Sequence, residues 1–256
     1  MIPLIPTPHM LLIVCPLVLL AGFVDSIAGG GGLISLPAYY MAGLPPALAS
    51  GTNKLAAAMG TSLAACHYGR CGRVNGAIAW PGAVGAFLCS ALGALLMRQL
   101  PQTVVRYLVL GCIPVAAFFT LRGNGKMPKA PALSPGQVRL LSLLIGCAVG
   151  FYDGLVGPGT GTFLILLFMR LFGIEAVMAS GTAKVVNLAS NLAALGSLLI
   201  TGDVMVLLGL PAGACAMLGA FMGSRLTIRR GAGLVRGMML AVLALLLAKV
   251  CLDMIR

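Results

Sequence analysis

Two lysines stand out in a chain of 256 residues that is 60% hydrophobic and only 9% charged. Lys54 and Lys184 close two copies of nearly the same hexapeptide, "ASGTNK" (49–54) and "ASGTAK" (179–184). Each hexapeptide begins a long apolar stretch, so each lysine is brought toward the membrane interior. A charge in that position is costly unless it is paired or hydrated, and it marks a candidate functional residue.

Two aspartates are repeated in the same way. Asp25 and Asp153 each lie four residues before a glycine cluster, "GGGG" (29–32) and "GPGTG" (157–161). Such clusters disfavour a continuous helix, and lipid cannot satisfy the freed backbone groups. Paired helix breaks in corresponding positions of two halves indicate a transporter binding site, and the restarting helices offer N–H groups to an anion. The alternative is that the glycines only allow close helix packing.

The lysines and aspartates have several possible roles. Lys54 and Lys184 could contact an anionic substrate, form ion pairs with Asp25 and Asp153 that hold the repeats together, or extend to the membrane interface. Asp25 or Asp153 could also carry a coupled proton, since membrane carboxyls exchange protons in many transporters. These alternatives stay open at the level of sequence.

Small and polar residues around these motifs complete the candidate site. We expect the Ser-Gly-Thr hydroxyls to cap the start of a helix, with the lysine in its first turn. Asn53, Asn187 and Asn191 add amides, which either bind substrate or join helices. The candidate substrate-binding residues are Gly29, Gly30, Gly31, Ser50, Thr52, Asn53, Lys54, Gly157, Gly159, Thr160, Ser180, Thr182, Lys184 and Asn187.

These residues are set in apolar runs that are long enough to cross a bilayer. With a mean hydropathy of +1.06, the chain has more apolar residues than the core of one soluble domain needs. We therefore predict an all-α polytopic membrane protein with two short segments, 33–44 and 162–172, that follow the glycine clusters. The eight long spans are expected at 10–30, 46–67, 76–97, 103–121, 137–157, 176–200, 204–224 and 233–254.

The repeated motifs divide the chain into two halves. We predict an N-terminal transmembrane repeat (1–121), a basic cytoplasmic linker (122–138) and a C-terminal transmembrane repeat (139–256). The loop after the first hexapeptide helix contains Arg70 and Arg73, whereas the equivalent second loop has no basic residue. In the next pair of equivalent loops the contrast is reversed, and the loop of the second half contains more basic residues than that of the first.

Under the positive-inside rule, equivalent loops of the two halves are therefore expected on opposite sides of the membrane. This indicates inverted repeats of about five helical elements each, with both termini outside. If the short segments re-enter without crossing, the halves are instead parallel and the termini lie inside.

Other function classes have little support. The net charge of +12 comes mainly from arginines and lysines in short loops, which topology explains better than nucleic-acid binding. No GxxxxGK[ST] motif for ATP is present. "CHYGRC" (66–71) supplies only three ligands, so we expect no metal site and no cofactor.

The motifs "GFVDSIAGGGGLISLP" with "ASGTNK", and "GFYDGLVGPGTG" with "ASGTAK", resemble the sulfite exporter TauE/SafE family. The resemblance extends over nearly the whole chain in repeat structure and linker position. It implies a multi-pass permease of the bacterial inner membrane that moves sulfite, sulfonates or other organosulfur anions. It also implies coupling to the proton gradient.

We therefore expect a secondary transporter for a small anion, working with protons in a lipid bilayer, without enzyme activity, and able to form a homodimer. A passive anion channel is the alternative. An intramembrane thiol-redox enzyme using Cys66 and Cys71 is a weaker one, because no nucleophile–base–acid arrangement supports catalysis.

Overall fold

The computed structural model describes residues 6–97, 99–100 and 133–255. Within these ranges the chain forms helices and short turns, and no β-strand occurs. The predicted all-α fold class is therefore confirmed. The span expected over 103–121 and most of the linker expected over 122–138 lie outside the described residues.

The helices follow the predicted order along the chain. The first half contains α1 (Pro8–Ala28), α2 (Gly32–Met41), α3 (Pro46–Arg70) and α4 (Gly76–Met97). The second half contains α6 (Pro135–Leu155), α7 (Thr160–Leu171), α8 (Ala176–Ile200), α9 (Val206–Arg230) and α10 (Ala232–Ile255). The short segments α2 and α7 are thus separate helices of 10 and 12 residues, each following a glycine break.

Of the eight spans expected, five coincide with described helices that are long and apolar enough to cross a membrane: α1, α4, α6, α8 and α9. Helix α3 is as long as α8, at 25 residues, but its composition is more polar. Large apolar side chains such as Leu12, Leu88, Leu140 and Leu218 are exposed on the outer faces of these helices. Such a surface is suited to lipid rather than to water.

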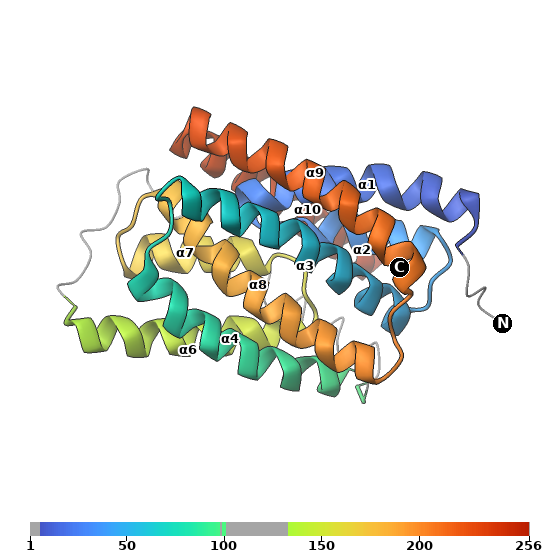
Figure 1. Ribbon diagram of the computed structural model, residues 1–256, viewed down its shortest axis with the longest axis horizontal. Coiled ribbons are helices and arrows are strands. Elements are labelled where there is room, and N and C mark those ends of the chain that lie inside the picture. The colour runs from blue at the N-terminus through green and yellow to red at the C-terminus, as the bar shows by residue number, and fades with distance from the viewer. Residues whose placement is uncertain (1–5, 98, 101–132, 256) are drawn as a thin grey trace.

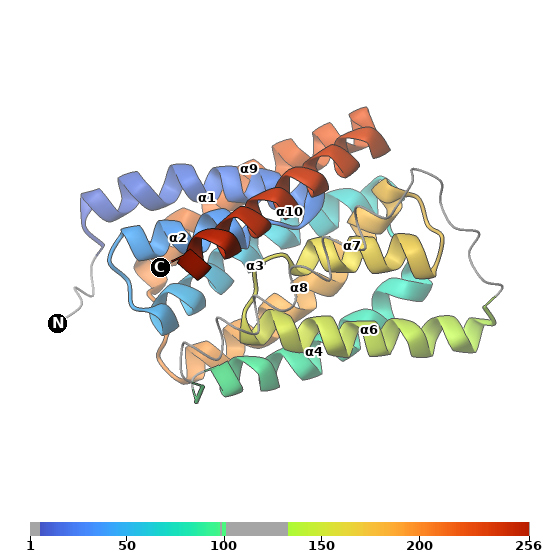
Figure 2. The ribbon, with the colours of Figure 1, turned by 180° about the vertical axis from the view of Figure 1, so that it is seen from behind.

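The two halves are interleaved (Figures 1 and 2). Helix α1 lies beside α9, and α4 lies beside α6, so each outer pair combines one helix from each half. Helices α3 and α8 cross between these pairs, and α2 and α7 lie next to them. A contact between an element of the first half and one of the second is often matched by a second contact, in which the equivalent elements of the two halves have changed places.

Small residues allow the two helices of each outer pair to approach each other closely. A side chain at Gly85 of α4 would meet the carbonyl of Leu143, and one at Gly219 of α9 would meet the carbonyl of Leu19. Because lipid tails are as apolar as leucine, such close van der Waals packing is a main source of helix association in membranes. The glycines of α4, α6 and α9 therefore hold the halves together.

The central helices run in opposite directions. Gly51, near the start of α3, contacts the backbone of Asp203, just after the end of α8. Gly181, near the start of α8, contacts the backbone of Arg73, just after the end of α3. Figure 1 shows the same relation for the helices that carry the aspartates, because α1 and α6 also run in opposite directions.

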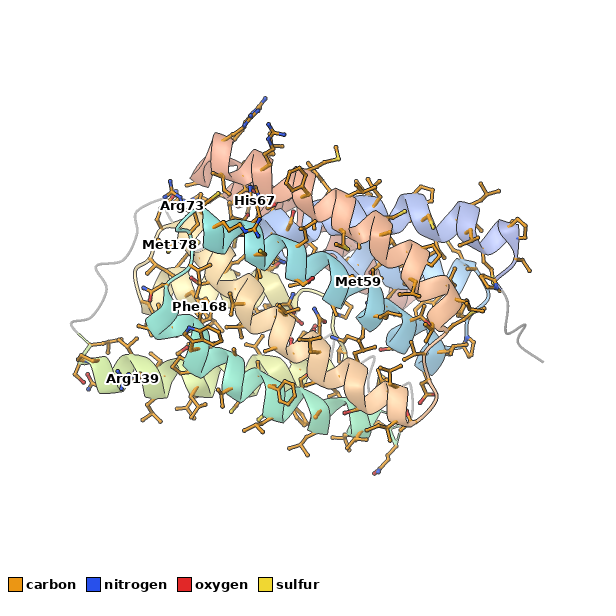
Figure 3. The ribbon with its side chains drawn as sticks, in the orientation of Figure 1. Met59, His67, Arg73, Arg139, Phe168 and Met178 are labelled. Atoms are coloured by element: carbon orange, nitrogen blue, oxygen red, sulfur yellow. The ribbon has the colours of Figure 1, made fainter. Side chains whose placement is uncertain are left out.

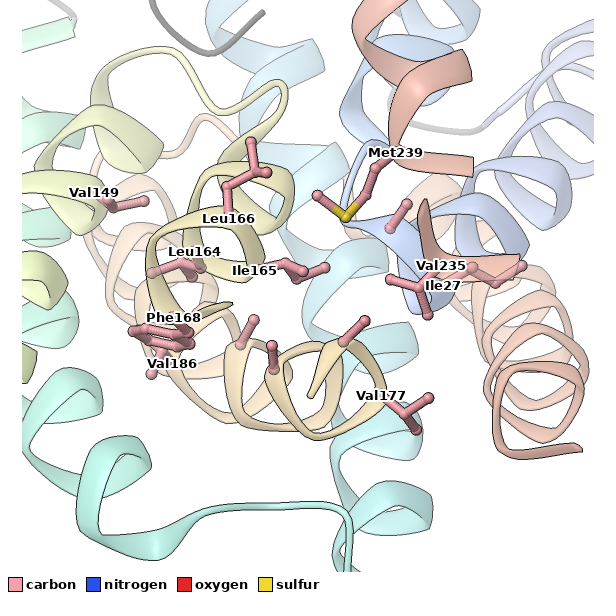
Figure 4. Packing of buried hydrophobic residues seen from close by; sticks show 14 of the residues in the cluster. Ile27, Val149, Leu164, Ile165, Leu166, Phe168, Val177, Val186, Val235 and Met239 are labelled. Carbon is pink, nitrogen blue, oxygen red and sulfur yellow. The ribbon is translucent and has the colours of Figure 1, made fainter. Parts of the chain in front are cut away.

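Buried apolar side chains surround α7 (Figure 4). Leu164, Ile165 and Phe168 of α7 are at most 1% exposed, and they pack in one cluster with Ile27 of α1 and Val186 of α8. Val235 and Met239 of α10 belong to the same cluster. The short helix α7 is therefore fixed inside protein rather than in lipid, as an interrupted helix in a membrane requires.

Candidate functional site

The two helix breaks touch each other at the centre of the bundle. Gly29 ends α1 with φ +79°, and its N–H donates to Asp25 O at 2.8 Å. In the second break, Gly157 and Gly159 have φ values of +90° and +86°. An added side chain at Gly29 would collide with the backbone of Gly161, so only glycine permits this approach.

The carbonyl groups freed at the end of α1 are satisfied by hydroxyl groups. The last carbonyls of a helix have no partner within the helix, and lipid offers none. Here each of three consecutive carbonyls accepts a hydrogen bond from another helix. Tyr68 donates to Ser26 O at 2.9 Å, Ser180 to Ile27 O at 2.7 Å, and Thr162 to Ala28 O at 2.7 Å.

Two ion pairs cross from one half to the other beside the breaks. Lys54 Nζ donates to Asp153 Oδ2 at 2.7 Å, and Lys184 Nζ donates to Asp25 Oδ2 at 2.7 Å. Each lysine is the ninth residue of its helix, counting from Pro46 in α3 and from Ala176 in α8. The lysines therefore lie in the third turn rather than in the first, deep enough to reach the opposite half.

The pair formed by Asp153 is closed to solvent. The side chain of Asp153 is 3% exposed and that of Lys54 is 6% exposed. Thr160 Oγ1 lies 2.8 Å from Asp153 Oδ1, and Ser190 Oγ lies 2.7 Å from Oδ2. Lys54 also donates to Asn191 Oδ1 at 3.0 Å. A buried ion pair requires such additional hydrogen bonds to offset the loss of hydration.

The pair formed by Asp25 has fewer partners. Besides Lys184, its carboxylate contacts the N–H of Gly31, which donates to Oδ1 at 3.3 Å. The side chain of Asp25 is 22% exposed, whereas Lys184 is fully buried. Gly31 directly precedes α2, so this carboxylate occupies the position at a helix N-terminus where an anion is favoured.

A cavity of about 60 Å³ lies between the two pairs. This volume is enough for a few water molecules or one small ion. Six helices, α1, α2, α3, α6, α7 and α8, contribute polar side chains to its wall. The predicted site residues that line it are Asp25, Gly29, Gly31, Asn53, Lys54, Asp153, Gly157, Thr160 and Asn187.

The other predicted residues surround the cavity without lining it: Gly30, Ser50, Thr52, Gly159, Ser180, Thr182 and Lys184. Lys184 lies behind Asp25, and Ser180 satisfies a carbonyl of α1. Gly30 faces the side chain of Val242 in α10. These residues hold the cavity wall in place.

The threonines of the two hexapeptides make matching contacts. Thr52 Oγ1 donates to Leu48 O and accepts from Met205 N, whereas Thr182 Oγ1 donates to Met178 O and accepts from Asn75 N. In both cases the backbone nitrogen lies 3.0 Å from the threonine Oγ1. Each threonine thus ties its helix to the loop after the central helix of the other half.

The prediction that Ser-Gly-Thr caps a helix start is wrong. The N-cap residues are Pro45 and Glu175, and neither makes a side-chain capping bond. The apolar Pro-Ala-Leu-Ala of α3 and Ala-Val-Met-Ala of α8 already adopt helix before each Ser-Gly-Thr. Inside a helix, a threonine hydroxyl bonds the carbonyl four residues back, as both threonines do.

Two further polar residues of α8 belong to the site: Ser190, which was not predicted from the sequence, and Asn191, whose role the sequence left open between substrate binding and helix association. Ser190 contacts Asp153, and Asn191 contacts Lys54 and lines the cavity. The helical spacing that places Asn191 on the face of Asn187 could also have indicated Ser190, three residues after Asn187. The first half has Gly60 and Thr61 at the aligned positions, so the repeat pattern did not draw attention to them.

The side chains of the "CHYGRC" segment point to different surroundings. Cys66 and Cys71 are free and exposed, and His67 Nδ1 lies 2.9 Å from Ser224 Oγ. In the part of the chain that the structure describes, no three metal-ligating groups come together.

The comparison with known families covers most of the chain. Residues 14–250 match the family described as "Sulfite exporter TauE/SafE". The chain belongs to the TauE/SafE family. The resemblance predicted from the glycine and hexapeptide motifs is thus confirmed.

Bacterial relatives match along almost their full length. A "Probable membrane transporter protein ORF9" of Sinorhizobium sp is 36% identical, covering 96% of this chain and 94% of that protein. A "Probable membrane transporter protein" of Haemophilus influenzae is 37% identical, covering 91% of each chain. "Probable membrane transporter protein YfcA" of Escherichia coli K12 is 37% identical, covering 92% of this chain and 87% of that protein. No solved structure matches the chain.

These comparisons establish the general activity. This TauE/SafE chain is a multi-pass membrane transporter and not an enzyme.

Proposed function

We propose that the chain is a secondary transporter for a small anion, either sulfite, a sulfonate or another organosulfur anion, driven by the proton gradient across the bacterial inner membrane. The observation that carries the proposal is the pair of crossed ion pairs beside a cavity at two helix breaks. Lysines, amides and helix N-termini are groups that bind oxyanions.

The carboxylates give this site a means of coupling. The two aspartates and two lysines cancel in formal charge, and Asp25 lies where an anionic ligand would be favoured. An anion that enters must therefore replace the charge of a carboxylate. Protonation of an aspartate removes that charge and frees its lysine, so proton binding and anion binding support each other.

We further propose that the halves are inverted repeats of five elements each, with the short helices completing the crossings. The exchange of contacts between halves and the opposite directions of α3 and α8 support this arrangement. Arg73 and Arg139 lie at one end of the bundle, where α9 also ends with Arg229 and Arg230 (Figure 3). We assign this basic end to the cytoplasm under the positive-inside rule.

The test uses purified protein in proteoliposomes under an imposed pH gradient. We expect saturable uptake of sulfite or a short sulfonate that rises with an inward proton gradient, and no uptake of amino acids or sodium. The double variant Lys54→Ala/Lys184→Ala should lose uptake, whereas Arg139→Ala, at an exposed helix start, should retain it. Full uptake by the double variant would contradict the site. Flux that neither saturates nor responds to pH would identify a passive anion channel instead.

A further inference from the structure

The two repeated ion pairs are not equivalent in their surroundings. Asp153 is 3% exposed and has Lys54, Thr160 and Ser190 around its carboxylate. Both carboxylates border the cavity, but Asp25 is 22% exposed and has a backbone N–H at 3.3 Å in place of the two hydroxyl groups. The carboxylate of Asp153 is thus held by more polar partners than that of Asp25, which is the more open of the two.

We propose that Asp25 alone takes up the coupled proton, and that the site then accepts a singly charged oxyanion rather than a dianion. This inference rests on the proposed function and deepens it by assigning the coupling residue and the charge of the substrate. Asp153 keeps its charge throughout and fixes Lys54 at the cavity wall.

The charged groups that face Asp25 set the charge of the ligand. They are Lys184 from α8, Lys54 from α3 and Asp153 from α6, with the neutral phenol of Tyr68 nearby in α3. While both aspartates are charged, the four charges sum to zero. Once Asp25 binds a proton, one positive charge is in excess, which matches one singly charged anion.

Proton and anion must then bind together. A protonated Asp25 with an empty cavity leaves Lys184, which is fully buried, without a counter-charge. An anion beside a charged Asp25 instead leaves one negative charge in excess. Either state places an uncompensated charge in a poorly solvated site, which is strongly unfavourable. Only the doubly loaded state and the empty charged state are neutral, so transport is coupled one proton to one anion.

The donors of the cavity fit such a ligand. Lys54 reaches the wall from one side, and the amides of Asn53, Asn187 and Asn191 surround the same space. Protonation of Asp25 also weakens its hold on the Gly31 N–H, which becomes free to donate to the anion. The volume of about 60 Å³ has room for a group of a few heavy atoms, such as a sulfonate head.

The experiment compares Asp25→Asn with its repeat-related control Asp153→Asn. Both proteins are reconstituted with an internal pH-sensitive dye. The probes are methanesulfonate and hydrogensulfite as single charges, and sulfate as the dianion. Proton entry on addition of methanesulfonate or sulfate, and anion exchange without a pH gradient, are measured separately. Thermal unfolding in detergent records whether each variant is folded.

We expect wild-type protein to admit protons with methanesulfonate but not with sulfate. Hydrogensulfite, which releases a proton of its own inside the vesicle, is followed by anion exchange only. Asp25→Asn should lose proton entry completely while slower anion exchange, now independent of pH, is still measurable. Asp153→Asn should unfold at a lower temperature than Asp25→Asn, and whatever transport remains should still bring protons.

Proton entry that persists in Asp25→Asn, or its loss in a folded Asp153→Asn with pH-independent exchange, would overturn the assignment of Asp25 while leaving anion transport intact. Proton-coupled sulfate entry would overturn the charge rule. Failure of wild-type protein to move any of the anions would overturn the proposed function itself, and this inference with it.

Discussion

At the residue scale, Lys54 and Asp153 show how strongly this fold depends on paired charge. Removing one partner of a buried pair leaves the other uncompensated and typically costs about 3–5 kcal/mol. We expect Lys54→Met to lower the free energy of unfolding in detergent by that amount. The double variant Lys54→Met/Asp153→Asn should recover much of the loss, because no charge is left unpaired.

The matched control is the ion pair between Arg73 and Glu175. Its nitrogen and oxygen atoms are 3.9 Å apart, and the two side chains are 44% and 49% exposed. Such surface pairs contribute at most about 1 kcal/mol, so Arg73→Met should change unfolding little. If the double variant is no more stable than Lys54→Met, the stability lost in Lys54→Met does not come from an unpaired Asp153 carboxylate. That result would contradict the prediction.

The contact between the two breaks gives a second prediction at this scale. Gly161→Ala would place a methyl group against the backbone of Gly29, which cannot move aside like a flexible side chain. We expect loss of folded protein, or a fall in unfolding temperature, measured by size-exclusion chromatography and thermal scanning. Gly196→Ala is the control, since that glycine also lies in a helix and faces open space. Equal behaviour of the two variants would contradict the backbone contact.

At the element scale, the threonines of the hexapeptides fix each central helix to a loop of the other half. Thr52→Val leaves the N–H of Met205 without its acceptor, and Thr182→Val does the same to Asn75. An unsatisfied buried group costs about 1–3 kcal/mol, so both variants should lower the free energy of unfolding by similar amounts. Denaturant titration in detergent measures the effect.

Ser62→Ala serves as the control for these variants. The hydroxyl of Ser62 lies on an exposed part of α3, the helix that carries Thr52, and donates to the carbonyl of Met59 within that helix. Its loss should have little effect. A strong effect of one threonine variant and none of the other would show that the two loops are not held in equivalent ways.

The helices themselves could be predicted well from sequence. Apolar length located α1, α4, α6, α8 and α9 within a few residues, and the glycine clusters located both breaks. The spans expected over 46–67 and 176–200 begin where α3 and α8 begin. Only the capping role expected of Ser-Gly-Thr was wrong, because neither N-cap residue makes a side-chain bond and the hexapeptides were the more conspicuous signal.

The partners of the site residues were harder to predict. Pairing of the lysines with the aspartates was one of three alternatives, and the sequence could not choose between them. The choice depends on α3 lying against α8 and reaching α6, contacts that join residues 99 positions apart. The repeat alignment also suggested two equal sites, whereas Ser190 and Asn191 occur only in α8 and make the cavity asymmetric.

At the scale of the whole molecule, the inverted arrangement predicts which loops face outside. Cys71 follows α3, and Gly202 follows α8, so they occupy equivalent loops of the two halves, and both are exposed. In intact cells, a membrane-impermeant maleimide should label Gly202→Cys in a cysteine-free background. It should not label a variant that retains only Cys71.

Permeabilising the cells provides the control, since the protein with Cys71 should then be labelled as well. Labelling of both positions from the same side would contradict inversion and favour parallel halves. Labelling of Cys71 alone in intact cells would reverse the assigned orientation while keeping the inversion.

The crossed ion pairs have a consequence for how the protein is made. Asp25 enters the membrane early in synthesis, yet its counter-ion Lys184 emerges 159 residues later. Until the second half is made, the nascent N-terminal portion holds a carboxylate and an ammonium group, Asp25 and Lys54, whose native partners do not yet exist. We therefore expect that neither portion expressed separately escapes proteolytic quality control, whereas the two portions produced together in one cell protect each other and accumulate.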